Sequence, residues 1–217
     1  MAKELPFESL DSLLPGDFFH LLHEISYVKD SSSETLKSPY LLPDVSPLFG
    51  EEKFADFHLG WNERGLLGYI KMSKPYEQSF FPNYEEGDSV EVFIDTRDLK
   101  KTGFATKFCH HFVFLSHEVQ EIQVQEVTKF RSEDSHPLCD SSEIECKCVY
   151  GKKEYSMLFF IPSSCLHGYD PQTFPRMGFT FKINRYKGQA QHFSVSSHYF
   201  DIMQSPSHWS SLIFIQP

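Results

Sequence analysis

Residues 88–95 read DSVEVFID, and this stretch decides the fold more than any other part of the chain. Val90, Val92 and Ile94 recur at every second position, and the acidic side chain of Glu91 falls between them. Successive side chains of a β-strand point to opposite faces, so this alternation predicts a strand with one apolar face turned toward a core. We therefore expect this strand to lie within an all-β domain.

The same alternation continues on both sides of that strand. Residues 54–61 alternate and end at Trp61, the turn at 62–65 follows, and residues 66–72 return as the partner strand. Gly65 can supply the positive φ that such a hairpin turn requires. Further strands are predicted at 110–115, 121–127, 144–150, 155–161, 178–184, 193–195 and 211–215. Many short strands separated by turns, without alternating helices, predict an antiparallel β-sandwich of jelly-roll-like form.

The N-terminal part of the chain has a different pattern. Residues 1–44 are expected to form an extension packed on the domain, which comprises residues 45–217. Apolar residues up to Ile25 follow a helical spacing and predict a short helix that begins near Asp17. Three prolines within residues 39–47 predict an extended, irregular connection.

Charge and hydropathy exclude several classes of partner. The chain of 217 residues has a formal net charge of −10, and its basic residues form no run longer than a pair. Nucleic acids and anionic membranes attract basic patches, so neither is an expected partner. The longest apolar run lies near residues 157–161 and is far shorter than the roughly 20 residues of a membrane span.

The N-terminus and the cysteines predict a cytoplasmic location. An acidic residue occurs at Glu4, and no apolar stretch leads to a small-residue cleavage site, so the segment does not have the pattern of a secretory signal. The five cysteines follow neither a disulfide-like nor a zinc-like spacing. Free thiols are typical of a reducing compartment.

Three segments, read in order, resemble the family 9 carbohydrate-binding modules and their DOMON-like relatives. Residues 55–69 contain a strand that ends in Trp, a short Asn-Glu turn and a second strand. Residues 87–95 are very similar to a signature strand of the family. Residues 155–184 contain an apolar strand that runs into Ile-Pro and a later strand that ends in Ile-Asn-Arg, as in the family. The resemblance covers roughly residues 45–217 and is closest to a bacterial branch of these modules.

The resemblance implies a non-enzymatic β-sandwich that binds carbohydrate. Family members clamp a terminal sugar between two Trp rings, and this chain has two Trp residues. An aromatic face can stack on the C–H face of a pyranose, and nearby carboxylates and guanidinium groups can bind hydroxyls. The predicted ligand contacts are Trp61, Glu91, Asp95, Arg97 and Trp209.

Several of these residues have an alternative role. Trp61 shares its strand face with Phe57, so it can equally be a core residue. Asp95 and Asp98 are candidate ligands for Ca²⁺, a hard cation that prefers oxygen. Alternatively, they belong to a turn in which Asp98 caps backbone N–H groups and Arg97 pairs with a carboxylate.

No enzymatic motif occurs in the sequence. Gly-x-Ser-x-Gly, Walker and dinucleotide patterns are absent. Cys165 and His167 lie two positions apart, but no third catalytic partner is visible. His110 and His111 are adjacent on a strand and point to opposite faces, so they cannot chelate one ion together.

Two other functions remain open. The chain can be a protein-interaction or scaffold domain on the same fold, in which case its partner is another protein and its sugar site has been lost. A DOMON-like haem module is the third possibility, although no Met and His pair stands out as axial ligands.

Overall fold

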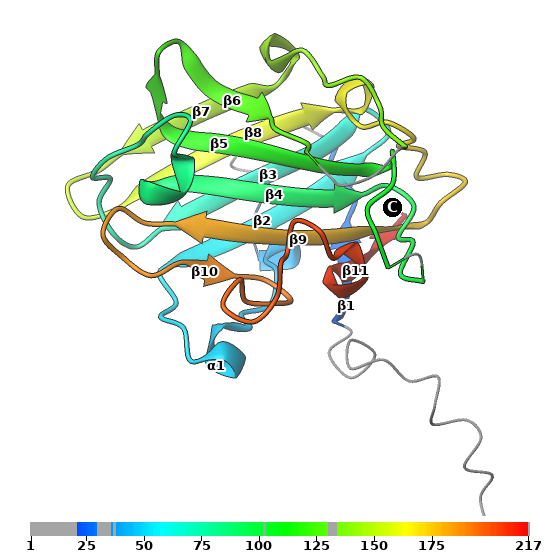
Figure 1. Cartoon of the computed structure of the whole chain (residues 1–217), viewed down its shortest axis with the longest axis horizontal. Helices are drawn as coiled ribbons and strands as arrows, with labels where there is room; N and C mark the ends of the chain where they lie inside the picture. The colour runs from blue at the N-terminus through cyan, green and yellow to red at the C-terminus, as the bar shows by residue number, and fades with distance from the viewer. Residues whose placement is uncertain (1–20, 30–35, 37, 102, 130–133, 217) are drawn as a thin grey trace, which may run out of the picture.

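The strand predicted at residues 88–95 forms β4, Ser89–Asp95, inside the larger of two β-sheets that pack face to face (Figure 1). The computed structural model describes residues 21–29, 36, 38–101, 103–129 and 134–216. The larger, seven-stranded sheet contains β1 (Leu22–Ser26), β4, β5 (Cys109–Val119), β6 (Ile122–Glu126), β9 (Arg176–Asn184), β10 (Gln191–His192) and β11 (Ser210–Ile215). The four-stranded sheet contains β2 (Ala55–Asn62), β3 (Gly65–Met72), β7 (Glu145–Tyr150) and β8 (Tyr155–Pro162).

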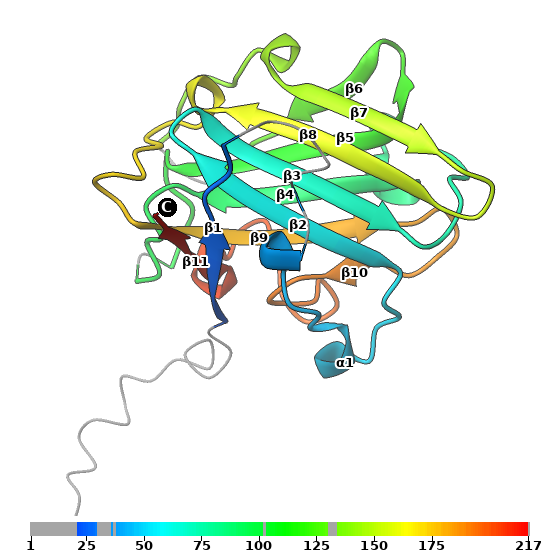
Figure 2. The same ribbon diagram turned by 180° about the vertical axis from the view of Figure 1, so that it is seen from behind.

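The sheet topology confirms the predicted β-sandwich. The larger sheet has the order β1-β11-β9-β4-β5-β6, with β10 paired to β9, and the smaller one has the order β2-β3-β8-β7. The named strands pair antiparallel, apart from β1 and β11, which are parallel. Figure 2 gives the view from behind the molecule, in which the smaller sheet lies in front of the larger one.

Aromatic side chains join the two sheets. The rings of Phe57 on β2 and Phe181 on β9 are stacked with centroids 4.5 Å apart, and Phe114 on β5 lies 4.3 Å from Phe159 on β8. All four side chains belong to one buried cluster. Aromatic pairs of this kind contribute roughly 0.5–1.5 kcal/mol beyond the apolar area that they bury.

The predicted hairpin between β2 and β3 is confirmed. Asn62 pairs with Gly65, so two residues form the loop between the strands. Gly65 has a φ of 147°, and a Cβ atom at this position would lie 2.1 Å from the carbonyl oxygen of Ile161. Only glycine fits a turn with this close approach of two backbones.

The predicted N-terminal helix is wrong in its described part. Residues 17–20 lie outside the described residues, but Leu22–Ser26 form the strand β1, parallel to β11. Ile25 on this strand is 1% exposed and belongs to the central core, so this part of the predicted extension shares the core of the domain. A short apolar run fits either type of element, and here the pairing with β11, distant in sequence, decides between them.

Two smaller expectations also differ from the structure. The strand predicted at 193–195 is instead β10, Gln191–His192, and the chain then leaves the sheet. Within the proline-rich connection, the short helices Ser38–Tyr40 and α1, Ser46–Phe49, interrupt the extended chain. Pro47 lies in the first turn of α1, where its missing N–H leaves no hydrogen bond unmade. Among the described residues, no helix has the length and hydropathy that a membrane span requires.

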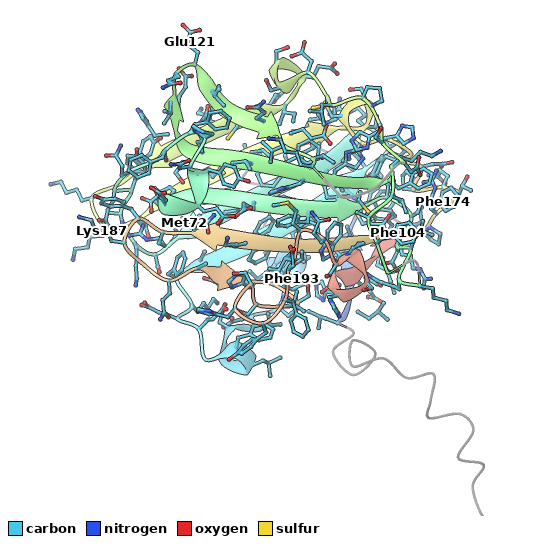
Figure 3. All side chains as sticks on the ribbon, viewed as in Figure 1. Met72, Phe104, Glu121, Phe174, Lys187 and Phe193 are labelled. Atoms are coloured by element: carbon cyan, nitrogen blue, oxygen red, sulfur yellow. The ribbon has the colours of Figure 1, made fainter. Side chains whose placement is uncertain are left out.

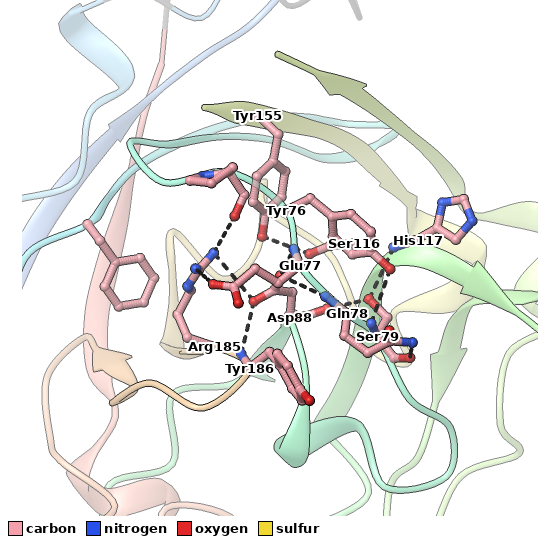
Figure 4. A network of polar contacts seen from close by, with 12 residues as sticks. Tyr76, Glu77, Gln78, Ser79, Asp88, Ser116, His117, Tyr155, Arg185 and Tyr186 are labelled. Atoms are coloured by element: carbon pink, nitrogen blue, oxygen red, sulfur yellow. Dashed lines mark hydrogen bonds and ion pairs between the residues drawn. The ribbon is translucent and has the colours of Figure 1, made fainter. Parts of the chain in front are cut away.

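Asp88, the first residue of DSVEVFID, holds three segments together (Figure 4). Its side chain has no exposed surface. Oδ2 accepts hydrogen bonds from the backbone N–H groups of Glu77 at 2.6 Å and Gln78 at 3.3 Å. Oδ1 accepts one from Tyr186 N at 3.0 Å and lies 3.4 Å from Arg185 Nη1. The carboxylate therefore fixes the chain before β4 and after β9.

Candidate functional site

A buried carboxylate, that of Glu91, lies on the outer face of the larger sheet. Glu91 is 1% exposed. Its Oε1 accepts a hydrogen bond from Asn184 Nδ2 at 2.8 Å and lies 3.2 Å from Lys182 Nζ, while Oε2 lies 2.9 Å from His111 Nε2. The register of β4 and β9 places Lys182 directly opposite Glu91. The sheet therefore builds this ion pair as a cross-strand pair.

The surrounding groups keep Glu91 ionised. Burial raises the pKa of its carboxyl group, but the hydrogen bond from His111 and the positive charge of Lys182 lower it more, and the resulting pKa is about 2. A carboxylate that keeps its charge in a buried setting needs such partners. Glu91 is therefore an acceptor of hydrogen bonds at neutral pH.

A pocket of about 280 Å³ opens over this ion pair. We name it the β4–β9 pocket. Its lining residues are Glu85, Glu91, Phe93, Lys182, Ser197, Phe200, Asp201, Ile202 and Met203. Glu91 and Phe93 are buried and form the floor, whereas Glu85 and Asp201 are exposed at the rim.

The pocket combines polar groups with aromatic and apolar side chains. Its volume is near the lower end of the roughly 300–1,000 Å³ found for small-molecule sites, which likewise combine apolar walls with a few placed polar groups. Beside it, burial and the charges of Glu91 and Glu85 raise the pKa of Tyr84 to about 12. The Tyr84 hydroxyl therefore stays protonated and can donate or accept a hydrogen bond.

The structure places both tryptophans inside the protein, which corrects their predicted role as stacking platforms. Trp61 has no exposed surface, donates a hydrogen bond from Nε1 to the Ile25 carbonyl at 3.0 Å and lies against Tyr27 and Phe214. Phe57 and Leu59, at the alternate positions of β2, belong to the same buried cluster as Trp61, so the core alternative applies. Trp209 also has no exposed surface. Neither ring presents a face to a ligand in this structure.

Trp209 nevertheless shapes the pocket from behind. Its ring lies 5.7 Å from that of Phe93, and its Nε1 donates a hydrogen bond to the Ile202 carbonyl at 2.8 Å. Phe93 and Ile202 both line the pocket. The three residues belong to a second buried cluster on the outer face of the larger sheet. Trp209 is thus a support for the pocket and not a contact.

Asp95 and Asp98 form a turn at the end of β4. Asp95 accepts hydrogen bonds from the backbone N–H groups of Arg97 at 3.0 Å and Leu99 at 2.6 Å. Asp98 accepts one from Ser211 Oγ at 2.6 Å and lies 2.7 Å from Lys100 Nζ. These contacts favour a turn over a calcium site, because an ion would compete with an ammonium group already in place. The residue that caps the backbone N–H groups is Asp95, whereas the alternative predicted Asp98. The calcium site stays a prediction.

Arg97 is held by aromatic rings and a carbonyl group. Its guanidinium lies 3.6 Å from the ring centre of Phe174 and 4.7 Å from that of Phe108, and Nη1 donates to the Gly168 carbonyl. Such cation–π contacts fix a guanidinium without a carboxylate. Figure 3 shows Phe174 and Phe104 at one end of the sandwich, opposite the end that carries Lys187. Arg97 lies outside the β4–β9 pocket, and its predicted ligand contact stays a prediction.

Adjacent histidines confirm the predicted split between faces. His111 points outward to Glu91, whereas His110 lies 2.8 Å from Glu126 Oε1. Phe112, two residues after His110, belongs to the central core. His110 and Glu126 lie with His136 in the group of described residues that could hold a metal ion. The five cysteines are free.

Sequence reasoning found Glu91 but missed the rest of the pocket. Lys182 occupies an outward position in the alternation of β9, and a charge at that position of a predicted strand was the signal available. Phe200 and Asp201 lie in a segment without regular spacing, which the chain folds over the sheet. Their meeting with Glu91 depends on contacts between distant parts of the chain, which no local pattern shows.

The comparisons with known proteins support the fold. A family 9 carbohydrate-binding module from Caldicellulosiruptor kristjanssonii, in complex with cellotriose, matches with a TM-score of 0.65 and 15% identity over 90% of this chain and 94% of that chain. A structure of such a module from the same organism in complex with glucose gives 0.57 and 14% over 90% and 96%. A protein from Bacteroides uniformis, described as a candidate carbohydrate-binding protein, gives 0.59 and 12% over 90% and 99%.

No protein-family model and no curated protein matches the sequence. At identities this low, the likeness concerns the arrangement of the strands and not the residues of a site. It extends over nearly the whole length of each compared structure. The chain therefore has a β-sandwich fold like that of the family 9 carbohydrate-binding modules.

Proposed function

We propose that this chain is a non-catalytic carbohydrate-binding module whose ligand binds in the β4–β9 pocket. The observation that carries the proposal is the buried Glu91–Lys182 pair at the floor of a pocket with aromatic walls. Sugar hydroxyls both donate and accept hydrogen bonds, so a carboxylate beside an ammonium group suits them. Structural neighbours of the fold hold cellotriose and glucose, which supports a sugar as the ligand.

The charges of the pocket favour a neutral sugar. Glu85, Glu91 and Asp201 place three carboxylates in the lining, against the single ammonium group of Lys182. An anionic glycan would meet this negative field as well as the net charge of −10 of the chain. Lys182 Nζ lies 3.2 Å from Glu91 and 3.4 Å from Glu85, so one of its three N–H groups remains for a hydroxyl.

Calorimetric titration with glucose, cellotriose and a panel of neutral and acidic oligosaccharides tests this proposal. We expect a neutral sugar to bind the wild-type chain, and Lys182→Met to weaken this binding at least about tenfold, because a charged hydrogen bond is worth roughly 1.5–3 kcal/mol. Phe200→Ala should also weaken binding through loss of the half-buried ring.

Lys71→Met is the matched control. Lys71 also lies on a strand and pairs with a glutamate, since its Nζ is 3.4 Å from Glu154, but it belongs to the other sheet. This variant should bind sugar as the wild type does. If Lys182→Met binds sugar with the affinity of the wild type, the β4–β9 pocket is not the binding site. If the wild type binds no sugar, the proposed function is wrong.

The alternative is a protein-interaction domain on the same fold. Both tryptophan rings are buried, and β7 is an edge strand on which Val149 is 58% and Tyr150 46% exposed. An exposed edge can add a strand from another chain. A chain that binds no sugar but captures a partner, with the capture lost on Val149→Lys, would favour this function.

A further inference from the structure

Three potential metal ligands converge where β5 begins and β6 ends. His110 Nδ1 and His136 Nε2 each lie 2.8 Å from the same oxygen, Glu126 Oε1. The three ligand atoms all lie within 4.8 Å of one another. Phe112 pairs with Glu126 in the register of the two strands, so His110 and Glu126 are diagonal neighbours on the inner face. His136 arrives from the following loop.

This group is almost completely buried. The side chains of His110 and Glu126 have no exposed surface, and that of His136 is 3% exposed. Both imidazole rings lie within hydrogen-bond distance of the same oxygen of Glu126, so the carboxylate has two nitrogen partners in a buried setting. A buried anion shared by two imidazole rings is a ready counter-charge for a cation.

Neighbouring groups already orient the carboxylate. Thr128 Oγ1 donates to Glu126 Oε1 at 2.8 Å, and the backbone N–H of Cys139 donates to Oε2 at 2.7 Å. His110 Nε2 is buried without a hydrogen-bond partner among the described residues. Protein metal sites commonly fix their ligands through outer contacts such as those of Thr128 and Cys139 with Glu126.

We propose that His110, Glu126 and His136 form a binding site for a divalent transition-metal ion, with Zn²⁺ as the best fit. Two imidazole nitrogens and one carboxylate oxygen are a common zinc ligand set, whereas Ca²⁺ prefers oxygen alone. Ligands about 2.1 Å from a tetrahedral ion lie roughly 3.3 Å apart. The two separations of 2.8 Å from Glu126 therefore need to widen by about half an ångström, and the two imidazole nitrogens already lie within 4.8 Å of each other.

Metal binding would replace the hydrogen atoms that now join the imidazoles to Glu126. His110 would bind through Nδ1, the atom that now faces Glu126, and carry its proton on Nε2. The ion would fasten the loop that carries His136 to β5 and β6. This site is separate from the β4–β9 pocket, because His110 faces inward and none of its three ligands lines that pocket.

Calorimetric titration of the reduced, chelator-treated full chain with Zn²⁺ tests the site. We expect one Zn²⁺ per chain, no comparable binding of Ca²⁺, and a higher melting temperature with Zn²⁺. His136→Gln should weaken Zn²⁺ binding by more than about 100-fold, since loss of an outer contact alone costs roughly 10–100-fold. His136 lies on a loop, and circular dichroism would confirm that the variant is folded.

His192→Gln is the matched control. His192 is also a buried histidine, with Nδ1 2.7 Å from Glu51 Oε1, but no second imidazole completes its set among the described residues. This variant should bind Zn²⁺ as the wild type does. The absorption spectrum with Co²⁺ should lack the thiolate charge-transfer band that ligation by any of the five cysteines would give. Wild-type affinity in His136→Gln, a thiolate band or no Zn²⁺ binding at all would overturn the proposal.

Discussion

Asp88 explains why an acidic residue stands at the head of the strand that decides the fold. Sequence alternation gives the carboxylate no role, because Asp88 precedes the alternating positions. In the structure it accepts hydrogen bonds from three backbone N–H groups and faces Arg185. Without the carboxylate the three backbone N–H groups would lose this acceptor, whereas Arg185 would keep its contacts with Pro75 and Glu77.

We expect Asp88→Ala to lower the free energy of unfolding by about 3 kcal/mol, in the range found when one partner of a buried ion pair is removed. Urea unfolding would measure the change. Asp140→Ala is the control, because Asp140 also accepts a backbone N–H, from Ser142 at 2.9 Å, but is exposed. Similar losses in both variants would show that the Asp88 contacts have no special weight.

His110 and His111 show what a single residue step does on a strand. The two rings point to opposite faces, and each is paired with a different glutamate. Alternation predicted the opposite directions. It could not predict Glu126 or Glu91 as partners, because strand register depends on pairing between distant segments. Local pattern therefore finds which face a residue occupies, and tertiary structure decides what it meets there.

At the scale of elements, long alternating strands were predictable and short ones were not. The strand β4 and the β2–β3 hairpin follow from spacing and from one glycine. The short strands β1 and β10 have little pattern of their own, and each forms because a longer strand offers it an edge. The segment that closes the β4–β9 pocket was not predictable for the same reason.

The strand β1 gives a sharp test at this scale. We expect Ile25→Ala to lower the free energy of unfolding by about 3 kcal/mol, since Ile25 is 1% exposed and its removal leaves a cavity. Leu22→Ala lies on the same strand but at a position that is 56% exposed, so its effect should be small. If chemical denaturation gives Ile25→Ala the stability of the wild type, β1 is not part of the core.

At the scale of the whole molecule, ionised groups inside the sandwich couple folding to pH. Burial raises the pKa of Glu51, Glu91 and Glu126, but in each case nearby partners lower it more. The partner of Glu51 is His192, those of Glu91 are His111 and Lys182, and those of Glu126 are His110 and His136. Burial also lowers the pKa of His110. The unfolded chain therefore takes up more protons than the folded chain as the pH falls, and acid should unfold the protein.

The window follows from these shifts. His110 begins to lower stability below its ordinary pKa of 6.5, because the unfolded imidazole is protonated first. The contribution of Glu91 is complete above about pH 4.5 and is lost as the pH falls to about 2; it amounts to roughly 3 kcal/mol.

Urea unfolding between pH 7 and pH 2.5 should show this decline. Glu91→Gln should flatten the curve below pH 4.5, whereas Glu154→Gln, at a side chain that is 57% exposed, should leave it unchanged. Parallel curves for all three chains would mean that the charge of Glu91 does not stabilise the sandwich, and that its contacts with His111 and Lys182 do not hold its pKa below the ordinary value.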